Sequence, residues 1–376
     1  MSDRAGELER RRLGETFERL CRIESPSGFE APLAGEIEGQ LGALGVASRR
    51  DETGNVFALL PAASDAARED SHGSLLLCAH MDTVPLAAPV EPVLVDGGWE
   101  NQNEGILGAD NKAAVAVLLE LARRYARAPA PVALELLFTV EEERALGGAK
   151  QFDVSALRSR VGFVFDHASP IGEIVCASPT YYRLEATLRG ASAHAGVRPE
   201  DGRSAIVAAA RAVAAMRLGR IDPQTTANIG VIGGGDAENV VPEHCVVRGE
   251  ARSLDAAVAE RTVSEMVEQL QDAANIPECC CDLDVVVERL FDGYRMPAGS
   301  AAVAIARRAL SACGYAPSEI ATGGGSDANA LLPRGIECVN LANGTERNHQ
   351  PDERVSVDAL EGMLDVGLAL VGSAAR

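Results

Sequence analysis

Two ionisable residues follow an apolar run in residues 74–85, "SLLLCAHMDTVP". The first half of this segment has the composition of a buried strand, and His80 and Asp82 stand at its end with only one residue between them. An unpaired polar group in a protein interior costs stability, so a buried strand gains nothing from ending in two of them. Side chains two residues apart lie on the same side of a strand. The Asp82 carboxylate can therefore hold one imidazole nitrogen of His80 and leave the other free to bind a metal ion.

Three further segments show the same pattern, an apolar run that leads to carboxylates or a histidine: 132–143, 161–167 and 336–349. Continuous apolar runs are typical of strands that helices cover on both faces. Helical patterns, such as residues 111–128, lie between them, and this alternation predicts an α/β fold. In such sheets ligands bind beyond the carboxyl ends of the strands, so we expect these polar residues to share one site.

The middle of the chain has a different pattern. Residues 178–291 follow the order strand, helix, strand, strand, helix, strand, which is that of a ferredoxin-like domain. We therefore predict two domains. The larger domain, residues 1–177 and 292–376, carries the expected shared site and has a mixed, mostly parallel sheet flanked by helices, and the inserted ferredoxin-like α+β domain, residues 178–291, could act as a lid.

The candidate metal ligands other than His80 also have ordinary explanations. Asp110 stands just before a predicted helix, where a short acidic side chain is a normal N-cap. The glutamates at 141–143 could form a solvated turn, Asp166 could cap a turn, and His349 lies in a polar loop. Together, however, two imidazoles and several carboxylates at one sheet edge suit zinc or another divalent first-row metal. Two histidines suffice for two ions if a carboxylate bridges them at a separation of roughly 3.5–4 Å.

The composition of the chain excludes several other classes of protein. The 376 residues carry a formal net charge of -20, which disfavours nucleic acid and anionic membrane surfaces as partners. The N-terminal segment is charged and amphipathic, without the apolar core of a signal peptide, and no run approaches the length of a membrane span. Nine cysteines, an odd number in a long chain, argue for a reducing compartment. We therefore expect a cytoplasmic protein that binds no nucleic acid and no membrane.

Seven segments resemble, in order, the motifs of the M20 family of di-zinc metallopeptidases, and in particular its peptidase T-like (tripeptidase-like) branch: "AHMDTVP", "GADNKAAVA", "FTVEEERALGGAK", "DHASPIGEI", "GASAHAG", "GGGSDAN" and the terminal "NH". The likeness runs from about residue 25 to the C-terminus and includes the inserted domain. It implies a hydrolase that cleaves amide bonds in short peptides. It also implies two Zn²⁺ ions per chain, with Co²⁺ or Mn²⁺ as substitutes.

Carried over position by position, the resemblance implies two metal sites that share one ligand. His80, Asp110 and Asp166 would hold one zinc ion. Asp110, as the bridging carboxylate, would hold the second ion together with Glu143 and His349. Two ions that share a water lower its pKa from that of bulk water to about 7.

The resemblance also implies the catalytic and substrate-binding residues. Glu142 would be the general base that takes a proton from this water and gives it to the leaving amine, and Asp82 would orient His80. His194, in "GASAHAG", would stabilise the developing oxyanion. The positions that would bind substrate are Asn239, Arg252, Gly324, Gly325 and Ser326.

Two alternatives to a peptidase remain open. The first is an N-acyl amino acid amidohydrolase, a deacylase that uses the same di-metal site. The second is a non-catalytic homologue that binds metal or peptide, which loss of a ligand or of the base would favour, and none is lost. Aspartate at position 166 favours the aminopeptidase and tripeptidase members of the family.

The inserted domain has two alternative roles. In many dimeric relatives it forms the dimer interface and its histidine reaches the partner's active site, which implies a homodimer. The apolar face of residues 204–219 could pack against a second copy, or it could cover the sheet of its own domain. Whether His194 acts in its own chain or in its partner's stays open.

Overall fold

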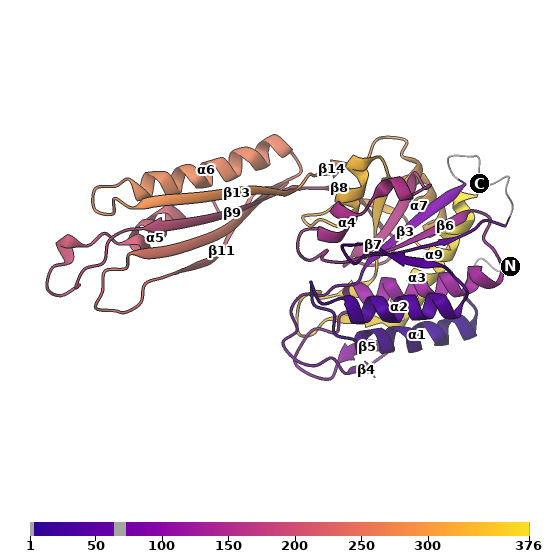
Figure 1. Cartoon of the computed structure of the whole chain (residues 1–376). Helices are drawn as coiled ribbons and strands as arrows, with labels where there is room; N and C mark the ends of the chain where they lie inside the picture. The colour runs from indigo at the N-terminus through magenta and orange to yellow at the C-terminus, as the bar shows by residue number, and fades with distance from the viewer. Residues whose placement is uncertain (1–3, 64–72, 376) are drawn as a thin grey trace. The chain divides into compact units, whose positions relative to one another are not determined.

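A computed structural model describes residues 4–63 and 73–375 of the protein. The chain forms two compact units. The first comprises Met1–Cys176, Arg295–Ala321 and Gly325–Arg376, and the second comprises Ala177–Tyr294 and Thr322–Gly324. The second unit is thus a long insertion in the first, together with a three-residue segment from later in the chain (Figure 1).

A mixed sheet lies at the centre of the first unit, with nine strands among the described residues. Its four central strands are parallel and lie in the order β6 (Ala133–Thr139), β3 (Ser74–His80), β7 (Val161–His167) and β16 (Glu337–Ala342). Every residue of β3 and β6 is buried, as expected for parallel strands with helices on both faces. The strands outside these four are β1 (Ser48–Arg50), β2 (Val56–Leu60), β8 (Glu173–Ser178), β14 (Tyr294–Arg295) and β15 (Ser318–Ala321). The pairs β2·β6 and β16·β8 are antiparallel, and the predicted fold class is confirmed.

Helices enclose this sheet. α3 (Ala109–Arg127) and α9 (Val357–Ala374) pack on β3 and on each other, and α7 (Ala301–Ala312) packs on α9. α1 (Glu7–Cys21) and α2 (Ala31–Ala43) pack on α3 (Figure 1). The short helices α4 (Gly147–Gln151) and α8 (Asp327–Leu331) pack against each other. No helix in the described ranges has both the length and the apolar character needed to cross a membrane.

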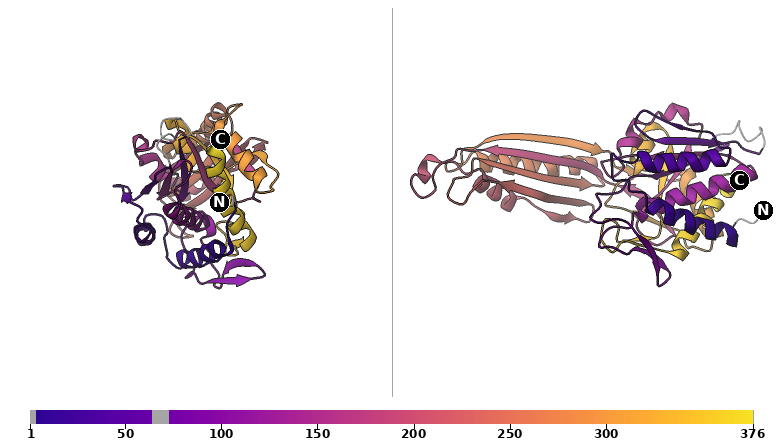
Figure 2. Two further views of the ribbon diagram at one scale, coloured as in Figure 1. Left: turned by 90° about the vertical axis from the view of Figure 1, so that its right-hand side faces the viewer. Right: turned by 60° about the horizontal axis from the view of Figure 1, so that its bottom comes forward.

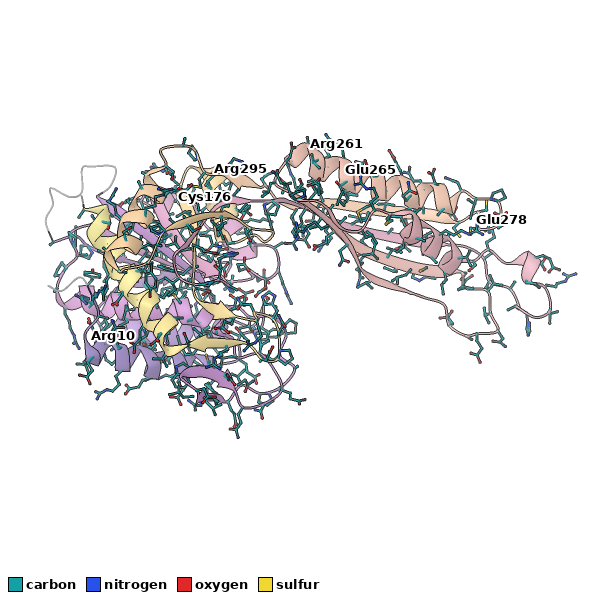
Figure 3. The ribbon with its side chains drawn as sticks, turned by 180° about the vertical axis from the view of Figure 1, so that it is seen from behind. Arg10, Cys176, Arg261, Glu265, Glu278 and Arg295 are labelled. Carbon is teal, nitrogen blue, oxygen red and sulfur yellow. The ribbon has the colours of Figure 1, made fainter. Side chains whose placement is uncertain are left out.

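Ion pairs join the first and last helices of the first unit. Arg10 of α1, labelled in Figure 3, lies 2.7 Å from carboxylate oxygens of both Glu361 and Asp365 on α9.

A small sheet in the first unit has the strand order β17-β18-β5-β4. Its strands are β4 (Pro92–Val95), β5 (Gly98–Asn101), β17 (Thr345–Glu346) and β18 (Arg354–Ser356). The loop between β17 and β18 carries His349.

The second unit is an antiparallel sheet with two helices on one face (Figure 2). Its elements are, in order, β9 (Thr180–Arg189), α5 (Ala205–Ala215), β10 (Gly219–Asp222), β11 (Thr225–Gly234), β12 (His244–Ser253), α6 (Ala256–Ala274) and β13 (Asp282–Phe291). Apart from the short β10, this is the order of elements that the sequence predicts. Exposed residues such as Arg261 and Glu265 lie on the outward face of α6 (Figure 3).

Candidate metal centre

His80 ends strand β3 with one ring nitrogen bound and the other directed at carboxylates. Its Nδ1 lies 3.0 Å from the main-chain oxygen of Asp82 and 3.3 Å from the Asp82 carboxylate. Both are acceptors, so Nδ1 carries the proton and donates. Nε2 lies 3.2 Å from Oδ1 of Asp110 and 3.3 Å from Oδ1 of Asp166. Because Nδ1 donates to Asp82, Nε2 is the nitrogen that can give its lone pair to a metal ion.

Asp82 also holds the turn that follows β6. Its Oδ1 accepts the main-chain N–H of Glu142 at 2.9 Å, and its Oδ2 accepts that of Glu143 at 3.1 Å and the Ser27 hydroxyl at 2.6 Å. Burial raises the pKa of Asp82, but the bonds to His80, Ser27 and Glu142 outweigh burial and hold that pKa below its usual value. One charged carboxylate therefore positions both His80 and the glutamate turn.

Asp110 faces both histidines of the centre. The N-cap of α3 is Gly108, with φ of 76°, and Asp110 and Asn111 in its first turn have non-helical dihedrals. Its Oδ1 points to His80 as above, and its Oδ2 lies 3.3 Å from Nε2 of His349. The N-cap interpretation therefore does not describe Asp110, because its carboxylate is directed at imidazoles.

The ligand atoms form overlapping groups. His80, Asp110 and Asp166 form one group, and Asp110, Glu143 and His349 form another, each with its ligand atoms within 4.8 Å of one another. Nε2 of His349 lies 2.7 Å from Oε1 of Glu143. A third group consists of His80, Glu142 and Glu143. Asp110 belongs to the first two groups, as a bridging carboxylate would.

Two carboxylates of the centre, those of Asp166 and Glu142, lack sufficient compensating positive charge. Burial, together with the charges of Asp110 and Asp327, raises the pKa of Asp166 to about 8, although the neighbouring imidazole lowers it. Burial and the charge of Asp166 raise the pKa of Glu142 well above its usual value. Bonds to Asp110 and Glu143 raise the pKa of His349 to about 10. A bound divalent cation would supply the missing charge, and mixed nitrogen and oxygen donors suit zinc, so these residues fit a metal centre.

The first glutamate of the run, Glu141, points elsewhere. Its Oε1 lies 3.5 Å from Arg144, and its main-chain N–H donates to Glu30. None of the three groups found among the described residues contains Glu141. Its neighbours therefore differ from those of Glu142 and Glu143.

Sequence reasoning missed four residues around the centre. Ser27 binds Asp82, as described above. The Asn348 side chain donates to Oδ2 of Asp110 at 2.8 Å. The Glu353 carboxylate accepts the main-chain N–H of Asp110 at 2.8 Å. Asp327 is buried, and its Oδ2 accepts the Thr139 hydroxyl at 2.5 Å. Asp327 lies in the quoted "GGGSD" and Asn348 in the terminal "NH", so both could have been singled out from the sequence.

His194 and Asn239 belong to the second unit and lie on neighbouring segments. The main-chain N–H of Ala195 donates to the oxygen of Asn239 at 2.9 Å. Both residues are exposed. Nδ1 of His194 accepts the N–H of Gly196 at 3.2 Å, so the ring proton is on Nε2. The exposed end of His194 is therefore a hydrogen-bond donor.

Arg252, also in the second unit, is paired with its neighbour on β12. Its Nε and Nη2 donate to the two carboxylate oxygens of Glu250 at 3.1 and 2.9 Å. Its guanidinium lies 4.0 Å from the centre of the Tyr181 ring, and Nη1 donates to the oxygen of Gly323 at 3.3 Å. Any carboxylate that binds Arg252 in the same two-pronged way must displace Glu250.

The glycine-rich segment passes from one unit to the other. Gly324 belongs to the second unit, and its oxygen accepts the Ser178 hydroxyl at 2.8 Å. Gly325 and Ser326 belong to the first unit, where Ser326 is buried at the start of α8.

Comparisons with known proteins agree with this picture. Residues 76–373 match the model of peptidase family M20/M25/M40. The chain is 34% identical over 379 residues to an uncharacterised protein, YqjE, of Bacillus subtilis (98% of this chain, 100% of the relative). An acetylornithine deacetylase of Myxococcus xanthus is 30% identical over 310 residues (76% of each chain).

Two solved structures cover nearly the whole chain. Aminopeptidase PepT of Bacillus cereus has a TM-score of 0.84 at 36% identity (98% of this chain, 99% of that one). A tripeptidase of Staphylococcus aureus has a TM-score of 0.89 at 31% identity with the same coverage. The resemblance seen in the sequence is confirmed: the chain belongs to peptidase family M20/M25/M40.

Proposed function

We propose that the protein is a two-metal aminopeptidase that acts on short peptides with a free amino terminus, tripeptides in particular. It would hold two Zn²⁺ ions per chain, with Co²⁺ or Mn²⁺ as substitutes. One observation carries the proposal: the two carboxylate oxygens of Asp110 face one histidine each, within two groups of ligand atoms. The likeness to an aminopeptidase and a tripeptidase over 98% of the chain supports this substrate class.

In the proposed reaction the residues of the centre have distinct tasks. Bound divalent ions would provide Lewis acidity and a water of lowered pKa. Glu142, whose own pKa is raised by burial and by Asp166, accepts a proton from the attacking water and gives it to the leaving amine. Asp82 keeps the Glu142 turn and His80 in place through the hydrogen bonds described above.

His194 would stabilise the oxyanion in the same reaction. Its Nε2–H is free to donate to the developing negative charge, because Nδ1 already accepts from Gly196. Two arrangements would bring it to the substrate: closure of the second unit as a lid within one chain, or contribution from the partner chain of a homodimer. A cytoplasmic location, inferred from the odd number of cysteines, is part of the proposal.

The choice of substrate can be tested with N-acetylated peptides. We expect the zinc-loaded protein to release the first residue of tripeptides and to spare the same tripeptides when they are N-acetylated. Product analysis by mass spectrometry distinguishes the two cases, with N-acyl amino acids as a third substrate set. Preferential hydrolysis of the acylated substrates would favour the deacylase alternative, which the relationship to an acetylornithine deacetylase supports.

A second prediction concerns the Glu250–Arg252 pair. If Arg252 binds the carboxylate end of the peptide, Glu250 competes with it, and Glu250→Gln should lower KM with little change in kcat. Partly exposed ion pairs contribute about 0.2–1 kcal/mol, so KM should decrease about 1.4- to 5-fold. Tripeptides with an amidated C-terminus should show no change in KM.

The matched control is Glu185→Gln, which breaks the exposed pair between Glu185 and Arg248 in the same sheet. It should leave KM for both peptide classes as in the wild type. An unchanged KM in the Glu250→Gln variant would mean that Arg252 does not bind the substrate carboxylate.

A further inference from the structure

Three residues of the loop between β17 and β18 contact Asp110. His349, a proposed ligand, lies 3.3 Å from its Oδ2. Glu353 and Asn348 contact the same residue but belong to none of the ligand groups in the described chain. Their contacts fall on different parts of Asp110, one on the main chain and one on the side chain.

Glu353 binds the main chain at the start of α3. Its carboxylate is buried, with 1% of the residue exposed. Oε2 accepts the N–H of Gly108 at 2.7 Å, and Oε1 accepts that of Asp110 at 2.8 Å. N–H groups in the first turn of a helix lack partners within the helix and attract negative charge. Glu353 therefore fixes the peptide units that set the direction of the Asp110 side chain.

Asn348 binds one oxygen of the Asp110 carboxylate. Its Nδ2 donates to Oδ2 at 2.8 Å, and Oδ2 is the oxygen that faces His349. The other oxygen, Oδ1, faces His80. The bond to Asn348 therefore restrains the oxygen that faces His349 and does not contact the oxygen that faces His80.

We propose that Asn348 and Glu353 are positioning residues that set the affinity of the two metal ions through Asp110, each in a different way. Asn348 acts on the ion held by Asp110, Glu143 and His349, whereas Glu353 acts on both ions because it holds the main chain. The inference rests on the proposed function, since it requires two metal ions. Substitution of a residue that hydrogen-bonds to a metal ligand typically weakens metal binding about 10- to 100-fold.

The test is the binding of Co²⁺ to metal-depleted full-length protein. Calorimetric titration measures the affinity of each binding event, and the visible absorption of the bound ion reports its surroundings. We expect two binding events in the wild type. Asn348→Ala should weaken one event about 10- to 100-fold and leave the affinity and absorption of the other unchanged. His349→Ala, which removes a proposed ligand, should abolish the same event and so identify it. Glu353→Gln should weaken both events.

Two controls separate positioning from a general loss of stability. Gln350→Ala changes an exposed residue of the same loop and should bind both ions as the wild type does. The metal-free Asn348→Ala protein should unfold at the wild-type temperature. Glu353→Gln leaves a buried N–H without its acceptor and should unfold at a lower temperature, so Asn348→Ala is the decisive variant.

Each outcome has a distinct meaning. If the wild type binds two ions and Asn348→Ala binds both with unchanged affinity, or weakens both equally, the inference is wrong and the proposed function stands. If the wild type binds no Co²⁺, the proposed function fails, and the inference fails with it.

Discussion

The Glu142→Ala variant is expected to keep both metal ions and to lose about 10²–10⁴-fold in kcat. The change removes the carboxylate that is proposed to take the proton from the attacking water, but it leaves the two ligand groups that share Asp110 intact. The fixed orientation of the turn should survive, because Asp82 binds main-chain N–H groups and not the Glu142 side chain. The measurements are steady-state kinetics on a tripeptide and elemental analysis of the purified variant.

Its two neighbours in the sequence provide matched controls. Glu141→Ala should change kcat only mildly, because the Glu141 carboxylate pairs with Arg144. Glu143→Ala should weaken metal binding as well as activity, because Glu143 contacts His349. If Glu141→Ala is instead the inactive variant that retains its metal, the assignment of the base is off by one residue.

Removal of metal should have the second large effect. Exhaustive chelation is expected to abolish hydrolysis, and addition of zinc, cobalt or manganese should restore it. The thermal midpoint should also fall, because the ions bind only the folded state and each ion contributes about 4 kcal/mol when present at 1,000 times its dissociation constant. The folded state gains from the ions because buried carboxylates crowd around Asp166 and, together with burial, raise its pKa to about 8. A bound cation offsets this repulsion.

A readout of metal content decides this prediction. Elemental analysis should find up to two divalent ions per chain before chelation and none afterwards. Full activity in protein that elemental analysis shows to be free of metal would exclude the proposed centre. A partial loss that follows the removal of one ion would instead assign unequal importance to the two ligand groups.

Much of the fold could be predicted because its signals are local. The apolar runs at 74–82 and 161–167 correspond to β3 and β7, and their parallel pairing brings their carboxyl ends to one edge of the sheet. The family could be identified because each motif is a short contiguous segment. The end of the run at 132–143 was predicted less well. β6 ends at Thr139, and the glutamates form a turn that Asp82 holds.

Residues that act through distant partners could not be found in this way. Arg252 has the charge expected of a carboxylate-binding residue, but its Nε and Nη2 already donate to the Glu250 carboxylate. Glu250 is two residues away on the same face of β12. The sequence places the two side chains on one face. It does not decide whether they pair with each other or with other groups, because cross-strand neighbours such as Tyr181 contribute to that choice.

The sequence by itself determined the family, the α/β class and the residue types of a candidate metal centre, because periodicity and short motifs are properties of contiguous residues. Only the tertiary structure decided how Asp110 is directed. Read locally, Asp110 is an ordinary N-cap, whereas in the folded chain its main-chain N–H and its carboxylate are bound by Glu353 and Asn348, 243 and 238 residues away. Contacts of that separation depend on the packing of the loop between β17 and β18 against the start of α3, which no local pattern specifies.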